Sequence, residues 1–139
     1  MILLDTNVIS QAMKPGGDAN VRGWLDAQRK SDLYICAPVL AELLYGAVHL
    51  PQGKKREALL SACAHIETVS FAGRILPFDQ SATHFYAKFR AKRHKEGRGV
   101  AEMDMAIAAI ASAHAMTLAT RNIWDFEGLD IPLFNPFSA

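Results

Sequence analysis

Cysteine, proline and glycine are scarce in this sequence of 139 residues, which contains 2 Cys, 6 Pro and 9 Gly. With 50% hydrophobic and 21% charged residues, the composition excludes a collagen-like, low-complexity or disordered chain. Both cysteines, Cys36 and Cys63, lie within apolar runs, which excludes a disulfide framework and a zinc-binding spacing. Unpaired cysteines favour a reducing compartment, so we expect a cytoplasmic protein.

Long hydrophobic runs and an excess of one charge are also missing. The longest apolar stretches are interrupted by Glu42 and Asp104. None therefore reaches the ~20 residues that a membrane-spanning helix needs, and we expect no membrane association. The formal net charge of +1 excludes a protein that holds nucleic acid by bulk charge, but it permits a local basic patch. The length predicts a single domain, 1–139, that can bury a core without disulfides.

Short apolar runs alternate with longer stretches of helical periodicity, which is typical of an α/β fold with a parallel sheet. The expected strands cover residues 2–4, 33–37, 75–78 and 117–120, with a fifth over 131–134. The fifth is predicted at an edge because Pro132 cannot donate a ladder hydrogen bond. Residues 5–7 are expected to form only a turn. The expected helices cover residues 20–29, 38–49, 54–68, 80–96 (after the N-cap Asp79) and 102–115.

Three carboxylates each stand alone in an apolar stretch. Asp5 is the only charged side chain in residues 1–13, Glu42 the only one in 33–53, and Asp104 the only one in 103–119. Solvated acids usually have Lys or Arg three or four positions away on a polar helix face. Taken singly, Asp5 could be a turn residue, Glu42 could point to water, and Asp104 could interact with a helix dipole. Together the three indicate one functional site.

These acids are expected at one edge of the sheet. Asp5 ends the first strand, Glu42 lies early in the helix after the second strand, and Asp104 lies in the first turn of the helix before the fourth. The polar run 120–122 follows the fourth strand, and Asp125 comes next. Open parallel sheets bind ligands outside the carboxyl ends of their strands. Carboxylates pushed together need a cation, and ligands that are all oxygen favour Mg²⁺ or Mn²⁺.

Four segments of the chain match, in order and spacing, the motifs of a known family. They are Met1-Ile-Leu-Leu-Asp5-Thr-Asn7, Ala41-Glu-Leu-Leu-Tyr-Gly46, Asp104-Met-Ala-Ile-Ala-Ala109 and Thr120-Arg-Asn-Ile-Trp-Asp-Phe126, followed by Asn135-Pro136. By these segments the whole chain resembles PIN-domain ribonucleases, and among them the VapC-type toxins of type II toxin–antitoxin systems (FitB-like branch). Each motif alone is weak, whereas four in order are specific.

The resemblance implies a three-layer α/β/α sandwich around a central, mainly parallel sheet of four to five strands. It implies a Mg²⁺-dependent endoribonuclease, in which Mn²⁺ can substitute. It further implies a homodimer and a cognate antitoxin that neutralises the toxin in a hetero-oligomer. Operator DNA would be contacted only through the antitoxin, because this sequence has no helix-turn-helix or ribbon motif of its own.

The resemblance also implies roles for individual residues. Asp5 and Asp104 would be the principal metal ligands, and Glu42 would be a third acid that reaches the metal directly or through water. Asn122 and Asp125 would share an outer catalytic position. The expected substrate contacts are Thr6, Thr120, Arg121, Lys92 and Arg93.

The basic residues are concentrated in one segment. Residues 88–98 hold six of the 15 Lys and Arg, with Glu96 as their only acid. This run ends just before Asp104, where it would guide an RNA backbone to the acidic edge. The alternative is an ordinary solvated helix face.

Two other functions stay open at this stage. One is a Mg²⁺-dependent phosphatase built on a similar sheet. The other is a non-catalytic PIN-like scaffold that forms the dimer core of a DNA-binding toxin–antitoxin complex. The full set of acids disfavours a loss of catalysis, but it is compatible with an additional role in DNA binding.

Overall fold

The computed structural model describes residues 1–99 and 101–139, and its centre is a sheet in which all neighbouring strands are parallel. Its strands are β1 (Ile2–Leu4), β2 (Leu33–Cys36), β3 (Ile75–Leu76), β4 (Thr117–Ala119) and β5 (Leu133–Phe134). Their order in space is β3-β2-β1-β4-β5, with β5 at an edge as predicted. Leu3 of β1 lies opposite Tyr34 of β2 and Leu118 of β4. Apolar runs form these strands because helices cover both faces of a parallel sheet.

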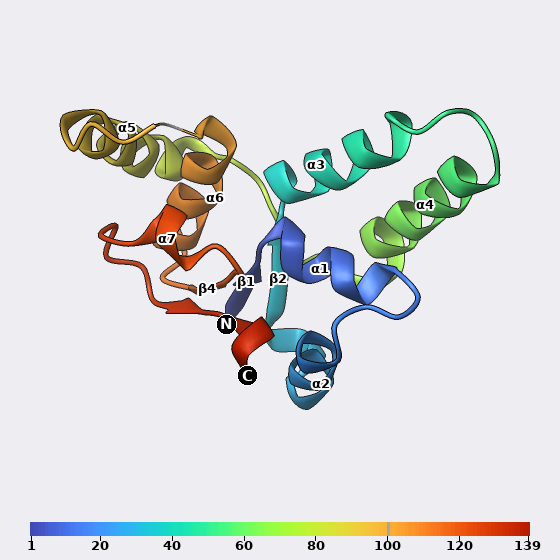
Figure 1. The fold of residues 1–139 in the computed structure, drawn as a ribbon. Coiled ribbons are helices and arrows are strands. Elements are labelled where there is room, and N and C mark those ends of the chain that lie inside the picture. The colour runs from blue at the N-terminus through green and yellow to red at the C-terminus, as the bar shows by residue number, and fades with distance from the viewer. Residues whose placement is uncertain (100) are drawn as a thin grey trace.

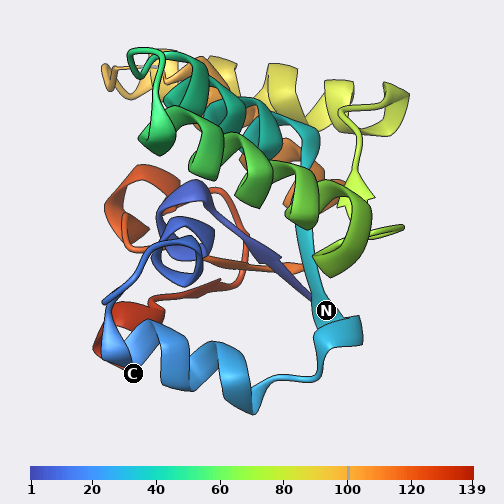
Figure 2. The ribbon, with the colours of Figure 1, turned by 90° about the vertical axis from the view of Figure 1, so that its right-hand side faces the viewer.

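The helices form two layers, one on each side of the sheet. They are α1 (Thr6–Met13), α2 (Ala19–Ala27), α3 (Ala37–Val48), α4 (Lys54–His65), α5 (Gln80–Lys95), α6 (Glu102–Ala113) and α7 (Ile123–Phe126). Figure 1 shows α5, α6 and α7 on the left of β1 and β2, and α1 to α4 on their right. Figure 2 shows α2 lying below the strands, away from α3 to α6. The predicted three-layer α/β/α class is confirmed.

The order of the strands reverses once along the chain. The chain moves outward from β1 through β2 to β3 and then returns to place β4 on the other side of β1. The helices after β1 and β2 therefore lie on one face, and those after β3 lie on the other, because such crossovers are right-handed. The space between the carboxyl ends of β1 and β4 is the usual ligand position in folds of this kind.

Two helices were not predicted from the sequence, α1 and the four-residue α7. Residues 5–7 were predicted to form only a turn, but α1 begins at Thr6 directly after β1. The carboxylate of Asp5 caps it by accepting a hydrogen bond from the Thr6 N–H at 2.8 Å. The run Asp5-Thr6-Asn7 is rich in residues that favour turns, and the same Asp is also a favoured helix N-cap, so the local sequence fits either structure.

The other predicted elements are confirmed within a few residues. The predicted helix over 54–68 is α4 continued by a π-helical turn, Ile66–Ser70. Asp79 caps α5 as predicted, since its side chain accepts from the Ala82 N–H. Within the described residues no helix combines the length and the apolar character needed to cross a membrane.

Arg93 does not lie on the surface. Only 1% of it is exposed, and its guanidinium donates to the main-chain oxygens of Asp125 at 3.0 Å and Glu127 at 2.7 Å. It also pairs with Glu96 at 3.1 Å. The expectation that Arg93 contacts RNA is therefore wrong: its donors hold α7 and the turn after it against α5. Sequence spacing alone did not reveal this, because Lys and Arg occupy five of the eight positions 88–95 and so do not mark one face of the helix.

We expect Arg93→Met to lower the free energy of unfolding by about 3 kcal/mol, because two buried carbonyl oxygens lose their donor. Lys95→Met, an exposed neighbour on the same helix, should change it by less than about 0.5 kcal/mol. Urea unfolding measures both values. Equal midpoints for the two variants would contradict the internal role of Arg93.

Candidate functional site

Asp5 lies at the carboxyl end of β1, beside the end of β4. Its main-chain N–H donates to the Ala119 oxygen at 2.9 Å, which joins the two strands. Its side chain is only 5% exposed and accepts from the Thr120 hydroxyl at 2.7 Å. Burial raises the pKa of the Asp5 carboxyl, while the Thr120 and Thr6 hydrogen bonds act in the opposite direction.

Thr120 holds several groups around Asp5. It is fully buried, and its hydroxyl oxygen accepts from the Asn122 main-chain N–H at 3.0 Å and from the Asn7 amide at 3.5 Å. Asn7 in turn accepts from the Arg121 N–H at 3.1 Å. Residues at the two ends of the chain are thereby tied together around one carboxylate. Asn7 received no predicted role, because two of its partners, Thr120 and Arg121, are more than a hundred residues away.

Glu42 reaches the same place from α3. Its carboxylate accepts from the Thr6 hydroxyl at 2.8 Å. Thr6 thus stands between two acids, because its main-chain N–H donates to Asp5 and its hydroxyl donates to Glu42. Both threonines predicted as substrate contacts, Thr6 and Thr120, donate their hydroxyls to carboxylates in this structure.

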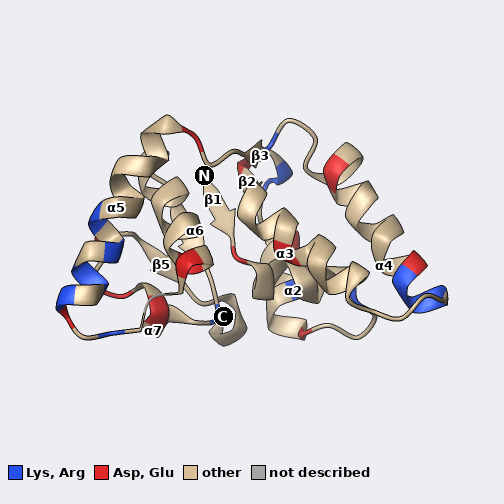
Figure 3. Ribbon diagram, turned by 90° about the horizontal axis from the view of Figure 1, so that it is seen from above, with Lys and Arg blue, Asp and Glu red and all other residues tan. Residues whose placement is uncertain are grey.

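Asp104 and Asp125 complete the acidic group from the opposite layer of helices. The pKa of the half-buried Asp104 carboxyl is raised to about 6, first by burial and then by repulsion from Asp5, Asp125 and Glu42. The charges of Glu42 and Asp125 also act on Asp5. In Figure 3 the acidic segments of α3, α6 and α7 and the segment after β1 border the same central region. We call Asp5, Glu42, Asp104 and Asp125 the acidic cluster.

No cation inside the described part of the protein compensates the acidic cluster. The ion pairs found there join Arg29 to Asp32, Arg90 to Glu102, and Lys92 and Arg93 to Glu96. Carboxylates that repel one another without a partner are stabilised by a bound cation.

The donor set fits a hard divalent cation, because it consists of carboxylate and hydroxyl oxygens. Within residues 1–99 and 101–139, however, no three His, Cys, Asp or Glu side chains are close enough to form a finished metal cage. Asp5 and Glu42 each accept a hydrogen bond from a threonine hydroxyl. A cation at this position would compete with those hydroxyls for the same oxygens.

The remaining predicted residues occupy different positions around the cluster. Asn122 is exposed, and its N–H donates to Thr120. Of the two residues expected to share an outer position, Asp125 is the one whose charge acts on Asp5 and Asp104. Arg121 is exposed, with its guanidinium 5.0 Å from the Phe137 ring centroid. Lys92 is exposed and lies 3.8 Å from Glu96.

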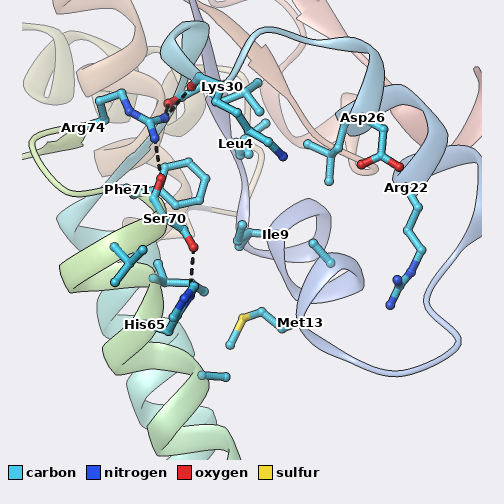
Figure 4. A pocket seen from close by; sticks show the side chains of 16 residues that line it. Leu4, Ile9, Met13, Arg22, Asp26, Lys30, His65, Ser70, Phe71 and Arg74 are labelled. Carbon is cyan, nitrogen blue, oxygen red and sulfur yellow. Dashed lines mark hydrogen bonds between the residues drawn. The ribbon is translucent and has the colours of Figure 1, made fainter.

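A separate pocket of about 830 Å³ lies between α1, α2 and α4. Figure 4 shows Arg74, Phe71 and His65 on one side of it and Arg22 and Asp26 on the other. None of the acidic cluster lines this pocket. It is therefore distinct from the candidate site.

The comparison with protein families matches residues 2–129 to the PIN domain, and the chain belongs to the PIN-domain family. It is similar to Toxin FitB of Neisseria gonorrhoeae, with 41% identity over 99% of each chain. It is also similar to VapC ribonuclease Y4jK of Sinorhizobium fredii, with 39% identity over 99% of this chain and 98% of the relative. The solved structure of FitAB bound to an IR36 DNA fragment contains a chain with a TM-score of 0.90 and 41% identity, covering 99% of this chain and 96% of that one. PIN-domain ribonucleases generally depend on a divalent metal.

Asp104 predicts how stability varies with pH. Its folded-state pKa of about 6 lies above the ordinary value of 3.8, so folding favours its protonated form. Its contribution to stability is full below about pH 4 and is lost as the pH rises through about 6. In EDTA at about pH 7.5, the free energy of unfolding of Asp104→Asn should exceed that of the wild type by about 1 kcal/mol, a value that allows for solvent screening. At about pH 4 the two should coincide.

Thermal or urea unfolding at both pH values makes this comparison. Asp26→Asn is the matched control, because it removes an exposed carboxylate of α2 that is outside the acidic cluster. If Asp104→Asn gave no gain in stability at neutral pH, repulsion within the cluster would be ruled out.

Proposed function

We propose that this protein is a Mg²⁺-dependent endoribonuclease toxin, in which Mn²⁺ can replace Mg²⁺, and that a cognate antitoxin neutralises it. The observation that carries the proposal is the acidic cluster, whose charges act on one another beside β1 and β4 without a cation. Similarity to a relative named VapC ribonuclease over nearly the full length of both chains supports RNA as the substrate. A similar relative is named as a toxin.

In this proposal Asp5 and Asp104 hold the metal ion, and Glu42 is the third acid. A bound divalent ion supplies an activated water and neutralises the negative charge that develops on the phosphodiester. The hydroxyls of Thr6 and Thr120 fix the orientation of Glu42 and Asp5. Asp125 adds negative charge at the outer side of the cluster, and Asn122 sits beside it at the start of α7.

We expect Asp5→Asn and Asp104→Asn each to lower the rate of RNA cleavage by about 100-fold or more, because each removes a charged ligand. EDTA should abolish cleavage by the wild type, and Mg²⁺ or Mn²⁺ should restore it. The assay follows a labelled single-stranded RNA on a gel, with circular dichroism to confirm folding and Asp26→Asn as the control variant.

The same assay separates the alternative enzymes. A phosphate monoester such as p-nitrophenyl phosphate should not be hydrolysed, because the proposal concerns an internal diester. Preferential hydrolysis of the monoester would indicate a phosphatase. Full metal-dependent cleavage by Asp5→Asn would reject the assignment of this carboxylate.

The basic end of α5 supplies the positive charge that RNA binding needs. Lys92 and Lys95 are exposed there, and Figure 3 shows the Lys and Arg positions of this helix gathered toward its end, near α7. Because the acidic cluster repels a phosphate backbone, nearby cations would hold the RNA close to it. We include Arg121, which is exposed at the end of β4, among the phosphate contacts.

A double charge reversal tests this surface. Lys92→Glu with Lys95→Glu should weaken RNA binding, and the plot of log affinity against log salt should become shallower by about 1.4 for two lost contacts. Lys54→Glu with Lys55→Glu is the matched control: it changes the net charge equally, at the exposed start of α4. If both pairs of substitutions weakened RNA binding equally, the effect would come from net charge alone, and α5 would not be a specific RNA-binding surface.

For its partners we propose a homodimer and a hetero-oligomer with the antitoxin. An exposed apolar face on α3 supports the dimer: Tyr45 is 64% exposed and Val48 is 48% exposed. The FitAB relative was solved with a bound DNA fragment, so a second role as the core of an operator-binding complex is compatible with catalysis. The antitoxin would provide the DNA contacts. We propose a cytoplasmic location, because RNA is the proposed substrate and the two free, buried cysteines agree with a reducing compartment.

A further inference from the structure

Trp124 is the most unusual side chain beside the acidic cluster. It lies on α7 with 68% of its surface exposed, although large apolar side chains are normally buried. Its chain neighbour Asp125 belongs to the acidic cluster. In Figure 3, α7 lies between the acidic start of α6 and the basic end of α5. Helix α7, which carries Trp124, therefore borders the place where the proposed reaction occurs.

The backbone beneath Trp124 is held firmly. Buried Arg93 donates to the main-chain oxygens of Asp125 and Glu127, and Phe126 is only 1% exposed. Arg98 donates to the Trp124 oxygen at 2.6 Å. Two arginines and one buried aromatic ring thus fix a four-residue helix that would not be stable alone.

Arg98 also fixes the ring itself. The centre of its guanidinium lies 4.2 Å from the centroid of the Trp124 ring, which is the distance of a cation–π contact. No other aromatic ring in the described residues stacks on Trp124. An exposed indole with a cation on one side is oriented for a planar ligand on its other side. Because folding already fixes the ring, little further side-chain entropy is lost when a ligand binds.

We propose that Trp124, backed by Arg98, is a stacking platform for a nucleobase of single-stranded RNA, next to the phosphodiester that is cut. The proposal rests on the proposed ribonuclease function and names the form of RNA recognised. An unstacked base presents a flat π-face to an aromatic side chain, whereas a base within a duplex does not. The basic end of α5 lies beside α7, so the cations Lys92, Lys95 and Arg98 match the phosphates that flank such a base.

Charge favours RNA over a protein partner at this position. Trp and Arg are also common in protein interfaces, so the surroundings decide. Lys92 and Lys95 are exposed in the last turn of α5, and the partly exposed Arg98 follows that helix; all three suit a polyanion. The other strongly exposed aromatic side chain, Tyr45, already stacks on His49 at 5.4 Å and lies on α3, away from this basic segment.

Fluorescence gives a direct test that does not depend on cleavage. The protein has two tryptophans, and Trp24→Phe leaves Trp124 as the only indole. Trp24 itself is half-buried and stacks on Phe134, so it serves as the matched control in the reverse variant, Trp124→Phe. In an Asp104→Asn background without added metal, a short single-stranded RNA should quench Trp124 and leave Trp24 unchanged.

Affinity and kinetics give the second measurement. Trp124→Ala should raise the Kd for single-stranded RNA about tenfold or more, whereas Trp124→Phe should raise it less than about threefold. In the enzyme with all carboxylates intact, Trp124→Ala should raise KM by a similar factor while kcat changes less. Duplex RNA should bind both forms with the same affinity.

The outcomes distinguish this proposal from the ribonuclease function. Absence of RNA cleavage by the wild type, with Trp124 quenched by RNA, would reject the nuclease and keep the stacking site. Normal Kd and KM in Trp124→Ala would overturn the stacking site and leave the nuclease in place. If Trp124→Ala instead weakened only self-association in light scattering, the indole would be a protein contact and the proposal would be wrong.

Discussion

Repulsion among the carboxylates of Asp5, Glu42, Asp104 and Asp125 is the constraint on which the function of this fold depends. Burial and mutual repulsion raise the pKa values of Asp5 and Asp104, so the folded protein without a cation gives up stability near neutral pH. Threonine hydroxyls relieve part of this cost at Asp5 and Glu42. A divalent cation would relieve more of it. Because repulsion in the empty site costs folding stability, a bound cation removes that cost. The relief of the repulsion therefore adds to the affinity of the site for the ion.

The sheet and its helices have the task of bringing these groups together against that repulsion. Because β4 pairs with β1, the segment after β4 lies beside the segment after β1, and Thr120 donates a hydrogen bond to Asp5 there. Arg93 does the same for the outer side of the site, because it holds α7, and with it Asp125, against α5. A basic residue buried in the structure therefore supports an acidic one at the surface of the site without pairing with its carboxylate.

Much of the fold and the acidic cluster was predictable from the sequence. The strands appeared as short apolar runs, and three of the acids stood out because each is alone among apolar neighbours. Helix α1 was missed because Asp5, which caps it, is also a common turn residue, and the run from Asp5 to Asn7 fits a turn as well as a helix start. Arg93 was assigned to RNA because a run of basic residues on a helix does not reveal which one faces inward. Trp124 received no role, since its exposure depends on how α7 is seated.

The sequence by itself determined the α/β class, the parallel strands and the identity of the acids, because periodicity and isolated charge are properties of neighbouring residues. Only the tertiary structure decided which groups meet. Thr120 and Asp5 are 115 positions apart, and Arg93 lies 32 positions from the Asp125 oxygen that it binds. Contacts of this kind depend on the return of the chain to β4 and on the packing of α5 against α7. Neither the return of the chain nor the packing of α5 against α7 can be predicted from a local sequence pattern, because both depend on the burial of the whole core.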